Sequence, residues 1–285
     1  MPLQLFEDAY GDIRNAQFLA VASDLAYYPQ GQGGPAFKEQ FGLEAVLFSV
    51  GNTQAYVATD ANNIVVAFRG TESPTTIDGL KDWLVTNAAN FLILPEGRMG
   101  TDFAAAGVGA RFHQGFVNAI TDIWDPVFAK VQAERTANDR PLWLTGHSLG
   151  GALALLAAWL FQRKFVPVHQ IYTYGGPMIG NEQAAKAINL AYANKIFRYV
   201  DLIDPIPKLP TVSLADSSFI HCECEIGLGA VSQGMTGAAE QLGSLVSQAV
   251  NGIINATLAD DIWKAVMGRL SAHSLDNYKR RIQSK

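Results

Sequence analysis

Continuous apolar segments alternate with segments of helical spacing along most of the chain. Between Ile13 and Tyr28 the apolar side chains recur every three or four residues and Pro29 follows, which predicts a helix. Two neighbouring segments, Ala45–Val50 and Ala55–Thr59, are typical of a β-hairpin. Short apolar runs predict four buried strands, which are Ile64–Phe68, Leu142–Thr145, Gln170–Tyr174 and Lys195–Val200.

Helical patterns separate the last three of these predicted strands. Such alternation is typical of a mostly parallel sheet covered by helices on both faces, so we expect an α/β fold. Neither a repeat nor a low-complexity linker interrupts the pattern, and we expect a single domain over residues 1–285. Functional sites in such sheets lie at the carboxyl ends of the strands, which here are Phe68, Thr145, Tyr174 and Val200.

Composition narrows the functional classes. Hydrophobic residues make up 49% of the 285 positions, which is enough for a large core and excludes a mainly disordered chain. The formal net charge is −5 and no basic run occurs, which argues against nucleic acid as a partner. The longest apolar run, Leu149–Phe161, is shorter than the ~18 residues that a transmembrane helix needs.

The N-terminal sequence bears on where the protein is found. Met1–Asp8 has no basic region followed by an apolar one, so no signal peptide is expected on this chain. A cytoplasmic protein, or a secreted one that is leaderless or trimmed, fits this pattern.

Cys222 and Cys224 are separated by one residue, too close for an unstrained disulfide. We therefore expect the fold to depend on its core alone.

A candidate nucleophile follows the strand that ends at Thr145. The sequence Gly146-His147-Ser148-Leu149-Gly150 lies between a buried strand and a helix-forming segment. This is the Gly-x-Ser-x-Gly elbow of α/β-hydrolases, in which small neighbours allow a sharp strand-to-helix turn. The turn holds the hydroxyl of Ser148 away from the sheet and directs the start of the helix at the reacting oxygen. We expect His147 to point away from that hydroxyl.

A nucleophilic serine needs a base and an acid that orients the base. Three histidines follow Ser148, and they are His169, His221 and His273. His169 precedes a strand, at the wrong edge of the sheet. His221 lies in the alternating segment Phe219–Glu225, which is typical of a hairpin strand, whereas His273 lies in a loop-like stretch before a helical pattern. His273 is therefore the preferred base.

The acid follows the strand that ends at Val200. Asp201 and Asp204 are both placed at its carboxyl end. Pro205 restricts Asp204 to an extended backbone and two further prolines stiffen the loop, which suits a carboxylate that must hold an imidazole in one orientation. We choose Asp204 over Asp201.

Several segments together resemble the class 3 lipases, the family of the filamentous-fungal triacylglycerol lipases. They are Val65–Thr71, Phe112–Phe116, Thr145–Gly151, Tyr174–Asn181 and Asp204–Pro210. The resemblance implies an α/β-hydrolase fold, a Ser148–Asp204–His273 triad and an oxyanion hole formed by Thr71 and Leu149. It also implies a lipase that acts on triacylglycerols and other acyl esters. No Gly-rich phosphate loop is present in the sequence, so no cofactor is expected. One departure from the family is a glycine- and alanine-rich insertion at 95–111.

Two segments are candidates for a cover over the site. Residues 72–90 contain Ile77, Leu80, Trp83 and Leu84, of which the first, second and fourth share one helical face, as in a lid that moves at a lipid surface. An ordinary surface helix with its apolar side on the core fits the same spacing. Residues 227–262, of which 227–258 contain Glu240 as the single charged residue, form either a helical cap or a helix packed on the core.

Other functions fit the same residues. Within hydrolases these are a feruloyl esterase, a phospholipase A1 type and a thioesterase, and from another class a non-catalytic lipase-like scaffold. His221, Cys222 and Cys224 lack a second ligand cluster, so no metal site is expected there. The sequence leaves acyl chain length and oligomeric state open.

Overall fold

A computed structural model describes residues 3–71, 92–209, 219–229, 264 and 267–285. Its helices are α1 (Ile13–Leu25), α2 (Gln30–Phe41), α4 (Gly100–Ala104), α5 (Gln114–Ala137), α6 (Leu149–Arg163), α7 (Glu182–Ala191), α10 (Leu270–His273) and α11 (Leu275–Gln283), with 3-10 turns η3 (Gly97–Met99) and η4 (Ile206–Lys208). The main sheet contains β1 (Glu44–Val50), β2 (Thr53–Thr59), β3 (Ile64–Phe68), β6 (Leu142–His147), β7 (Gln170–Tyr174), β9 (Ile196–Asp201) and β11 (Glu225–Leu228).

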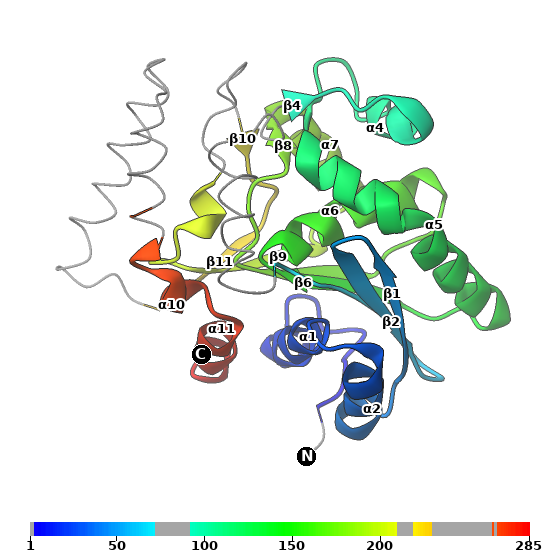
Figure 1. The fold of residues 1–285 in the computed structure, drawn as a ribbon, viewed down its shortest axis with the longest axis vertical. Helices are drawn as coiled ribbons and strands as arrows, with labels where there is room; N and C mark the ends of the chain where they lie inside the picture. The colour runs from blue at the N-terminus through cyan, green and yellow to red at the C-terminus, as the bar shows by residue number, and fades with distance from the viewer. Residues whose placement is uncertain (1–2, 72–91, 210–218, 230–263, 265–266) are drawn as a thin grey trace.

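The strand order in the main sheet is β1-β2-β3-β6-β7-β9-β11. The predicted hairpin is β1 paired with β2, and β3 also pairs with β2 antiparallel. From β3 onward every neighbouring pair is parallel, which confirms the predicted mostly parallel sheet. Ser148 and Asp204 follow strands β6 and β9, so both lie at the carboxyl edge of this sheet, which Figure 1 displays with helices above and below.

A second, smaller sheet lies beyond this edge. Its strands have two residues each and are β4 (Leu92–Ile93), β5 (Phe112–His113), β8 (Gly180–Asn181) and β10 (Phe219–Ile220). The expectation of one hairpin strand over Phe219–Glu225 is wrong, because β10 pairs with β8 whereas β11 pairs with β9 in the main sheet. The chain crosses between the two sheets within this segment, so the alternation of its side chains does not reflect a single strand.

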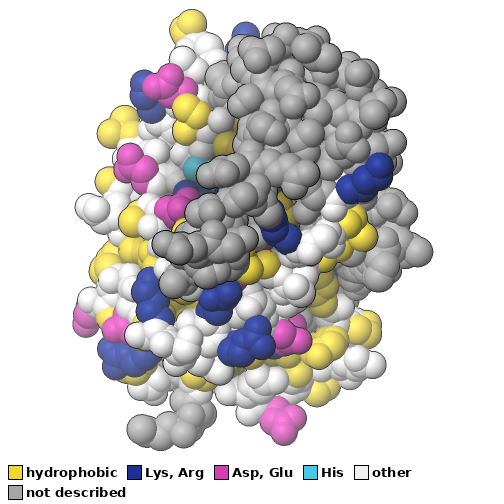
Figure 2. Space-filling model, turned by 90° about the vertical axis from the view of Figure 1, so that its left-hand side faces the viewer, with side chains coloured by type: hydrophobic (Ala, Val, Ile, Leu, Met, Phe, Trp, Pro, Cys, Tyr) yellow, Lys and Arg dark blue, Asp and Glu magenta, His cyan; other side chains and the backbone are white. Residues whose placement is uncertain are grey.

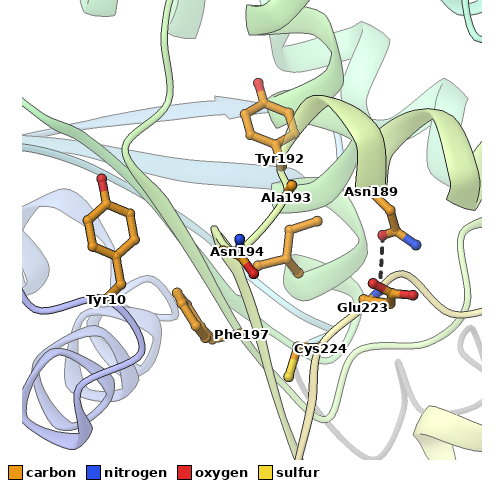
Figure 3. A pocket seen from close by; sticks show the side chains of 9 residues that line it. Tyr10, Asn189, Tyr192, Ala193, Asn194, Phe197, Glu223 and Cys224 are labelled. Carbon is orange, nitrogen blue, oxygen red and sulfur yellow. Dashed lines mark hydrogen bonds between the residues drawn. The ribbon is translucent and has the colours of Figure 1, made fainter.

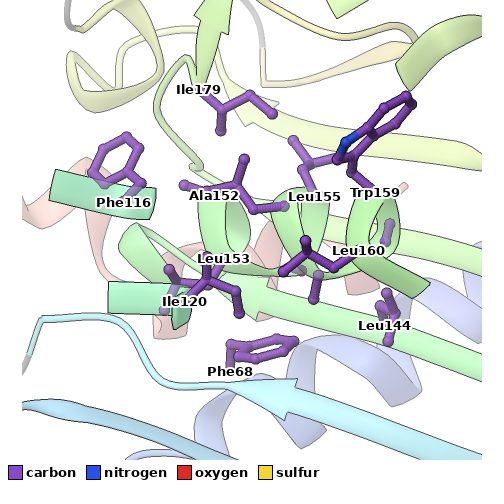
Figure 4. Packing of buried hydrophobic residues seen from close by; sticks show 14 of the residues in the cluster. Phe68, Phe116, Ile120, Leu144, Ala152, Leu153, Leu155, Trp159, Leu160 and Ile179 are labelled. Atoms are coloured by element: carbon purple, nitrogen blue, oxygen red, sulfur yellow. The ribbon is translucent and has the colours of Figure 1, made fainter. Parts of the chain in front are cut away.

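The central strands β3, β6 and β7 are buried on both faces, and each face of the sheet has its own core. Along β3, Ile64, Val66 and Phe68 belong to the core under α5 and α6, while Val65 and Ala67 belong to the core over α1. The two-residue period of a strand produces this division. Figure 4 shows Phe68 of β3 and Leu153 of α6 on the same side of the sheet.

Helix α6 is apolar on all sides because it is enclosed. All its residues from Leu149 to Phe161 are buried, and only the last two, Gln162 and Arg163, reach the surface. This helix contains the longest apolar run of the sequence, which therefore packs between the sheet and α5. Among the described residues, no helix combines the length and the apolar character needed to span a membrane.

The two segments predicted to cover the site lie mostly outside the described residues. Residues 72–90, with Ile77, Leu80, Trp83 and Leu84, lie outside the described residues. Of the second candidate, 227–262, the first two residues belong to strand β11, so this segment does not begin as a cap.

Figure 2 shows one face of the molecule, on which the Lys and Arg side chains of the described residues are interspersed with Asp and Glu.

Candidate active site

Ser148 occupies a strained turn between strand β6 and helix α6. Its φ of 57° and ψ of −129° place it in a region that residues with a side chain rarely adopt. Such a conformation costs ~1–3 kcal/mol and persists only where the surroundings impose it. Here the Ser148 N–H donates to the Tyr174 carbonyl over 2.9 Å, and the Ser148 carbonyl accepts from Gly151 N–H over 2.9 Å.

The glycines of the elbow are required by close backbone contacts. A Cβ on Gly146 would lie 2.2 Å from the carbonyl carbon and oxygen of Gly150. A Cβ on Gly150 would in turn lie 2.2 Å from the carbonyl oxygen of Phe68. Real Cβ atoms do not approach backbone this closely, so only glycine fits at either position. The sequence-based expectation that small neighbours permit the turn is therefore confirmed.

His273 and Asp204 form a buried pair. His273 Nδ1 lies 2.7 Å from Asp204 Oδ2, with Asp204 fully buried and His273 7% exposed. The Oδ1 atom of Asp204 accepts the backbone N–H of Ile206 over 2.9 Å. With the carboxylate as acceptor, Nδ1 of His273 carries the hydrogen, which leaves Nε2 as the basic nitrogen of a neutral imidazole. His273 is the last residue of the short helix α10 rather than part of a loop.

The imidazole of His273 lies against the elbow, and its buried Nε2 atom has no hydrogen-bond partner among the described residues. The ring centroid is 4.7 Å from that of His147, the residue before Ser148. A Cβ on Gly175 would lie 3.1 Å from Cε1 of His273, and the preceding Tyr174 carbonyl is the one that holds Ser148 N–H. The structure thus brings His273 to the elbow without a hydrogen bond to the Ser148 hydroxyl. Hydrogen bonds between catalytic groups are often long before substrate binds.

His147 has a different environment from His273. Its Nε2 atom lies 2.7 Å from the carbonyl oxygen of His273, and its Nδ1 atom lies 2.9 Å from the Tyr27 hydroxyl. A carbonyl only accepts, so Nε2 carries the hydrogen and Nδ1 accepts from Tyr27. Burial, and then the neighbouring His273, hold the pKa of His147 well below its ordinary value. His147 therefore stays neutral and fixes the main chain of His273.

The residues expected to stabilise an oxyanion flank the elbow. A Cβ on Gly70 would lie 3.1 Å from Cβ of Ser148 and 2.6 Å from the His147 carbonyl, so the main chain before Thr71 touches the elbow. Thr71 is half-buried and follows strand β3. On the other side, Leu149 is the first residue of α6, where main-chain N–H groups have no partner within the helix.

A second layer of polar residues around Asp204 was not found from the sequence. The Tyr278 hydroxyl donates to Asp204 Oδ2 over 2.6 Å. Asp201, the alternative acid, has no contact with His273; it accepts from Asn277 Nδ2 over 2.5 Å and forms an ion pair with Arg281 Nε at 2.6 Å. Asn277, Tyr278 and Arg281 lie in the predicted helix that follows His273, but helical spacing alone does not indicate their contacts with the two aspartates.

His169, His221 and the two cysteines do not form a common site with each other. His169 lies at the amino end of β7, and its Nε2 atom contacts the Glu7 carbonyl at 2.9 Å. His221 contacts the Pro207 carbonyl, and burial with the nearby Arg198 lowers its pKa to about 3. Cys222 is buried and Cys224 is exposed. Within the described part of the chain, no group of three or more His, Cys, Asp or Glu residues could hold a metal.

A cavity of about 280 Å³ lies far from the elbow (Figure 3). Ile196, the first residue of β9, lines it together with Tyr10 and Cys224, so it opens at the amino edge of the sheet. In the figure Asn189 accepts the backbone N–H of Glu223, over 3.0 Å. No candidate catalytic residue is among its described lining residues.

Comparisons with known proteins show the family of this chain. Residues 65–214 match the model of the lipase (class 3) family. A secreted mono- and diacylglycerol lipase of Fusarium solani is 35% identical over 161 residues, which cover 55% of this chain and 43% of that protein. A chloroplastic phospholipase A(1) of Arabidopsis thaliana is 30% identical over 161 residues, covering 53% and 34%. The match spans less than half the length of either relative.

Solved structures share the fold. The lipase of Rhizopus microsporus var. chinensis has a TM-score of 0.60 at 23% identity, covering 81% of this chain and 80% of that one. A triacylglycerol lipase whose catalytic centre is a serine protease triad has a TM-score of 0.62 at 21% identity, covering 76% and 80%. These likenesses confirm the predicted α/β-hydrolase fold.

Proposed function

The chain belongs to the class 3 lipase family, and we propose that it is a serine-dependent carboxylic ester hydrolase that cleaves acylglycerols. The observation that carries this proposal is the 2.7 Å contact between His273 Nδ1 and Asp204 Oδ2 beside the strained Ser148. A base oriented by a buried acid, next to a serine held in an elbow, is the arrangement that acyl transfer needs.

The proposed reaction has two steps. His273 Nε2 takes the hydroxyl hydrogen of Ser148 as its oxygen attacks the ester carbonyl, and the same nitrogen then protonates the leaving alcohol. Water, activated in the same way, then attacks the acyl-enzyme and releases a carboxylic acid. Asp204 keeps Nδ1 protonated and stabilises the imidazolium that forms in each step.

The tetrahedral intermediate needs donors for its oxyanion. We assign this role to the N–H of Leu149 and to the N–H and hydroxyl of Thr71. The contacts of Gly70 with the elbow support the second assignment, because they bring this part of the chain against Ser148. Loss of one such donor costs ~10²–10³-fold in kcat in other hydrolases.

The choice of acylglycerols rests on relatives and on the site together. Relatives are described as mono- and diacylglycerol lipases, and a structural neighbour as a triacylglycerol lipase. One relative is a phospholipase A(1), so phospholipids are the second substrate class that we consider. We further propose that the substrate is met at a lipid–water interface, with residues 72–90 as the lid.

Covalent labelling tests the proposal at the level of the nucleophile. An alkyl fluorophosphonate should label Ser148 stoichiometrically, as located by mass spectrometry, and His273→Ala should slow the labelling at least ~10³-fold. A folded chain that is not labelled would favour the non-catalytic scaffold. Hydrolysis of emulsified triolein, monoolein, phosphatidylcholine, a feruloyl ester and an acyl thioester then ranks the substrate classes, and acylglycerols should be cleaved fastest.

A further inference from the structure

A groove of about 680 Å³ lies on the outer side of helix α6, far from Ser148. Trp159, Gln162 and Arg163 of α6 form its floor, the segment after α4 forms one wall and α7 forms the other. Arg163 is the last residue of a 15-residue helix that begins beside Ser148, which places the groove ~20 Å from the elbow. In Figure 4 the Trp159 side chain points from α6 away from Phe68 and the sheet.

The walls of this groove are apolar and reach the surface. Val108 is fully exposed and Leu190 is 86% exposed, so both present whole side chains at the rim. Four alanines lie between them, and these are Ala105, Ala106, Ala187 and Ala191. Exposed apolar side chains gathered along a groove mark binding sites more often than single exposed residues do. Val108 and its neighbours belong to the glycine- and alanine-rich segment at 95–111.

The charge of the groove is positive, in a chain whose net charge is −5. Arg163 and Lys186 line it, and no Asp or Glu is among its described lining residues. Two acids beside the lining residues in the sequence are paired, Asp102 with Lys164 and Glu182 with Lys186, so the charge of Lys186 is offset and Arg163 supplies the positive charge of the lining. Arg163 differs from these cations, because its Nε atom is buried and has no hydrogen-bond partner in the described structure.

We propose that this groove binds a long-chain carboxylate, with its head group on Arg163 and its alkyl chain along the walls between Val108 and Leu190. An arginine can hold a carboxylate through two parallel N–H donors of its guanidinium group. The volume falls within the ~300–1,000 Å³ of small-molecule sites. A neutral lipid would fill the walls but leave the guanidinium unsatisfied.

A long-chain carboxylate is the product class of the hydrolysis proposed above, and only this link rests on the proposed function. The binding itself needs no turnover. The groove is thus a second lipid site, at the far end of the helix that begins at the nucleophile, where a released product can be held without occupying the catalytic edge.

Quenching of Trp159 by a chain-brominated fatty acid measures this binding. The full chain is titrated both unmodified and after reaction with an alkyl fluorophosphonate, so that occupancy near Ser148 and in the groove are separated. We expect saturable quenching that survives the labelling and is lost in Trp159→Phe. If the chain does not react with the fluorophosphonate, the proposed function fails. The quenching and its loss in Trp159→Phe still show whether the fatty acid binds in the groove.

Substitutions at the groove test its chemistry. Arg163→Gln should weaken dodecanoate binding at least ~10-fold, to the level of neutral dodecanol, because the charge-assisted pair is lost. Leu190→Asp should weaken it similarly, and affinity should rise up to ~4-fold for each methylene that the groove buries. Arg14→Gln, on helix α1, is the matched control and should change nothing.

Three results would overturn the proposal. They are quenching that persists in Trp159→Phe, equal affinity for dodecanoate and dodecanol, and unchanged affinity in Arg163→Gln. If Arg163→Gln does not fold, as judged by circular dichroism, Leu190→Asp decides the matter, since that side chain is at the surface and its replacement leaves the core intact. Unchanged affinity in a folded Leu190→Asp contradicts the groove as the binding site.

Discussion

Tyr278 and His273 donate to the same oxygen of Asp204. The Tyr278 hydroxyl lies 2.6 Å from Oδ2 and His273 Nδ1 lies 2.7 Å from it, while the Asp201 N–H donates to the Tyr278 oxygen over 3.1 Å. Burial, and then the charge of Asp204, raise the pKa of Tyr278 well above its ordinary value, so the phenol remains a donor. Tyr278 is therefore a positioning residue for the acid that orients His273.

Replacing Tyr278 with Phe should reduce kcat more than it changes KM. The substitution removes one of three donors to Asp204 and leaves the Asp201 N–H without a partner, and a hydrogen bond to a charged group contributes ~1.5–3 kcal/mol. We expect kcat to fall ~10-fold, with KM within ~2-fold of the wild type. Steady-state kinetics on a soluble short-chain ester provide the measurement.

Tyr56→Phe is the control for a general loss of stability. The Tyr56 side chain is buried and its hydroxyl donates to the Tyr28 carbonyl over 2.9 Å; among the described residues it has no hydrogen bond to Ser148, Asp204 or His273. Both variants should lose ~1–3 kcal/mol in urea unfolding, but Tyr56→Phe should keep its kcat. Equal kcat losses in the two variants would contradict a positioning role for Tyr278.

The two aspartates after β9 should respond differently to the same substitution. Asp204→Asn replaces the acceptor of His273 Nδ1–H and should lower kcat ~10³–10⁴-fold while the fold is kept. Asp201→Asn breaks the ion pair with Arg281, which is 29% exposed and can be rehydrated. That variant should lose ~2 kcal/mol of stability and less than ~10-fold in kcat. The reverse order of the kcat losses would assign the acid to Asp201.

His221 should make the stability of the protein depend on pH. Burial, and then Arg198, lower its pKa from 6.5 to about 3, so below pH ~6.5 the unfolded chain binds a proton that the folded chain does not. Stability is therefore complete above pH ~6.5 and is lost as the pH falls toward 3, by at most ~1.4 kcal/mol per pH unit from this group.

His221→Gln tests this dependence because Gln keeps a donor for the Pro207 carbonyl and has no titrating group. Urea unfolding at pH 7, 6, 5 and 4 should give a smaller loss of stability for the variant than for the wild type. Identical slopes for the two proteins would show that folding does not change the pKa of His221 and would contradict this prediction.

The elbow glycines give a prediction about folding. Gly150→Ala places a Cβ 2.2 Å from the Phe68 carbonyl and should destabilise the protein by at least ~3 kcal/mol. Gly31 is the matched control: it lies in helix α2, and a Cβ there has no atom within 4 Å. Gly31→Ala should be neutral or stabilise by up to ~1 kcal/mol. Thermal unfolding measures both effects.

The sequence allowed the strands that form the sheet and its carboxyl edge to be predicted, because buried apolar runs and elbow glycines are local signals. The proximity of His273 and Asp204 followed from chain order together with the family resemblance, although 69 residues separate them. The position of His273 at the end of a helix, instead of in a loop, was not predicted, since α10 has only four residues.

Other features depend on tertiary contacts that no local pattern encodes. The contacts of Tyr278 and Asn277 with the two aspartates exist because helix α11 packs under the end of β9, and helical spacing alone predicts only the helix. Strand β11 buries only one of its four residues, Leu228. It therefore lacks the apolar run that marks the other parallel strands, and its place in the main sheet was not predicted. The groove beside α6 is formed by α6, α7 and the segment after α4, which are far apart in the sequence and adjacent only in the folded chain.

The most direct test of the account is the kcat of Ser148→Ala on an emulsified acylglycerol, beside Ser49→Ala, which replaces an exposed serine of β1. Removal of the nucleophile should lower kcat by ~10⁶-fold, whereas Ser49→Ala should retain the wild-type rate, with both proteins equally stable to within ~1 kcal/mol. Wild-type hydrolysis by purified Ser148→Ala, free of other hydrolases, would contradict the assignment of this serine as the group that attacks the ester.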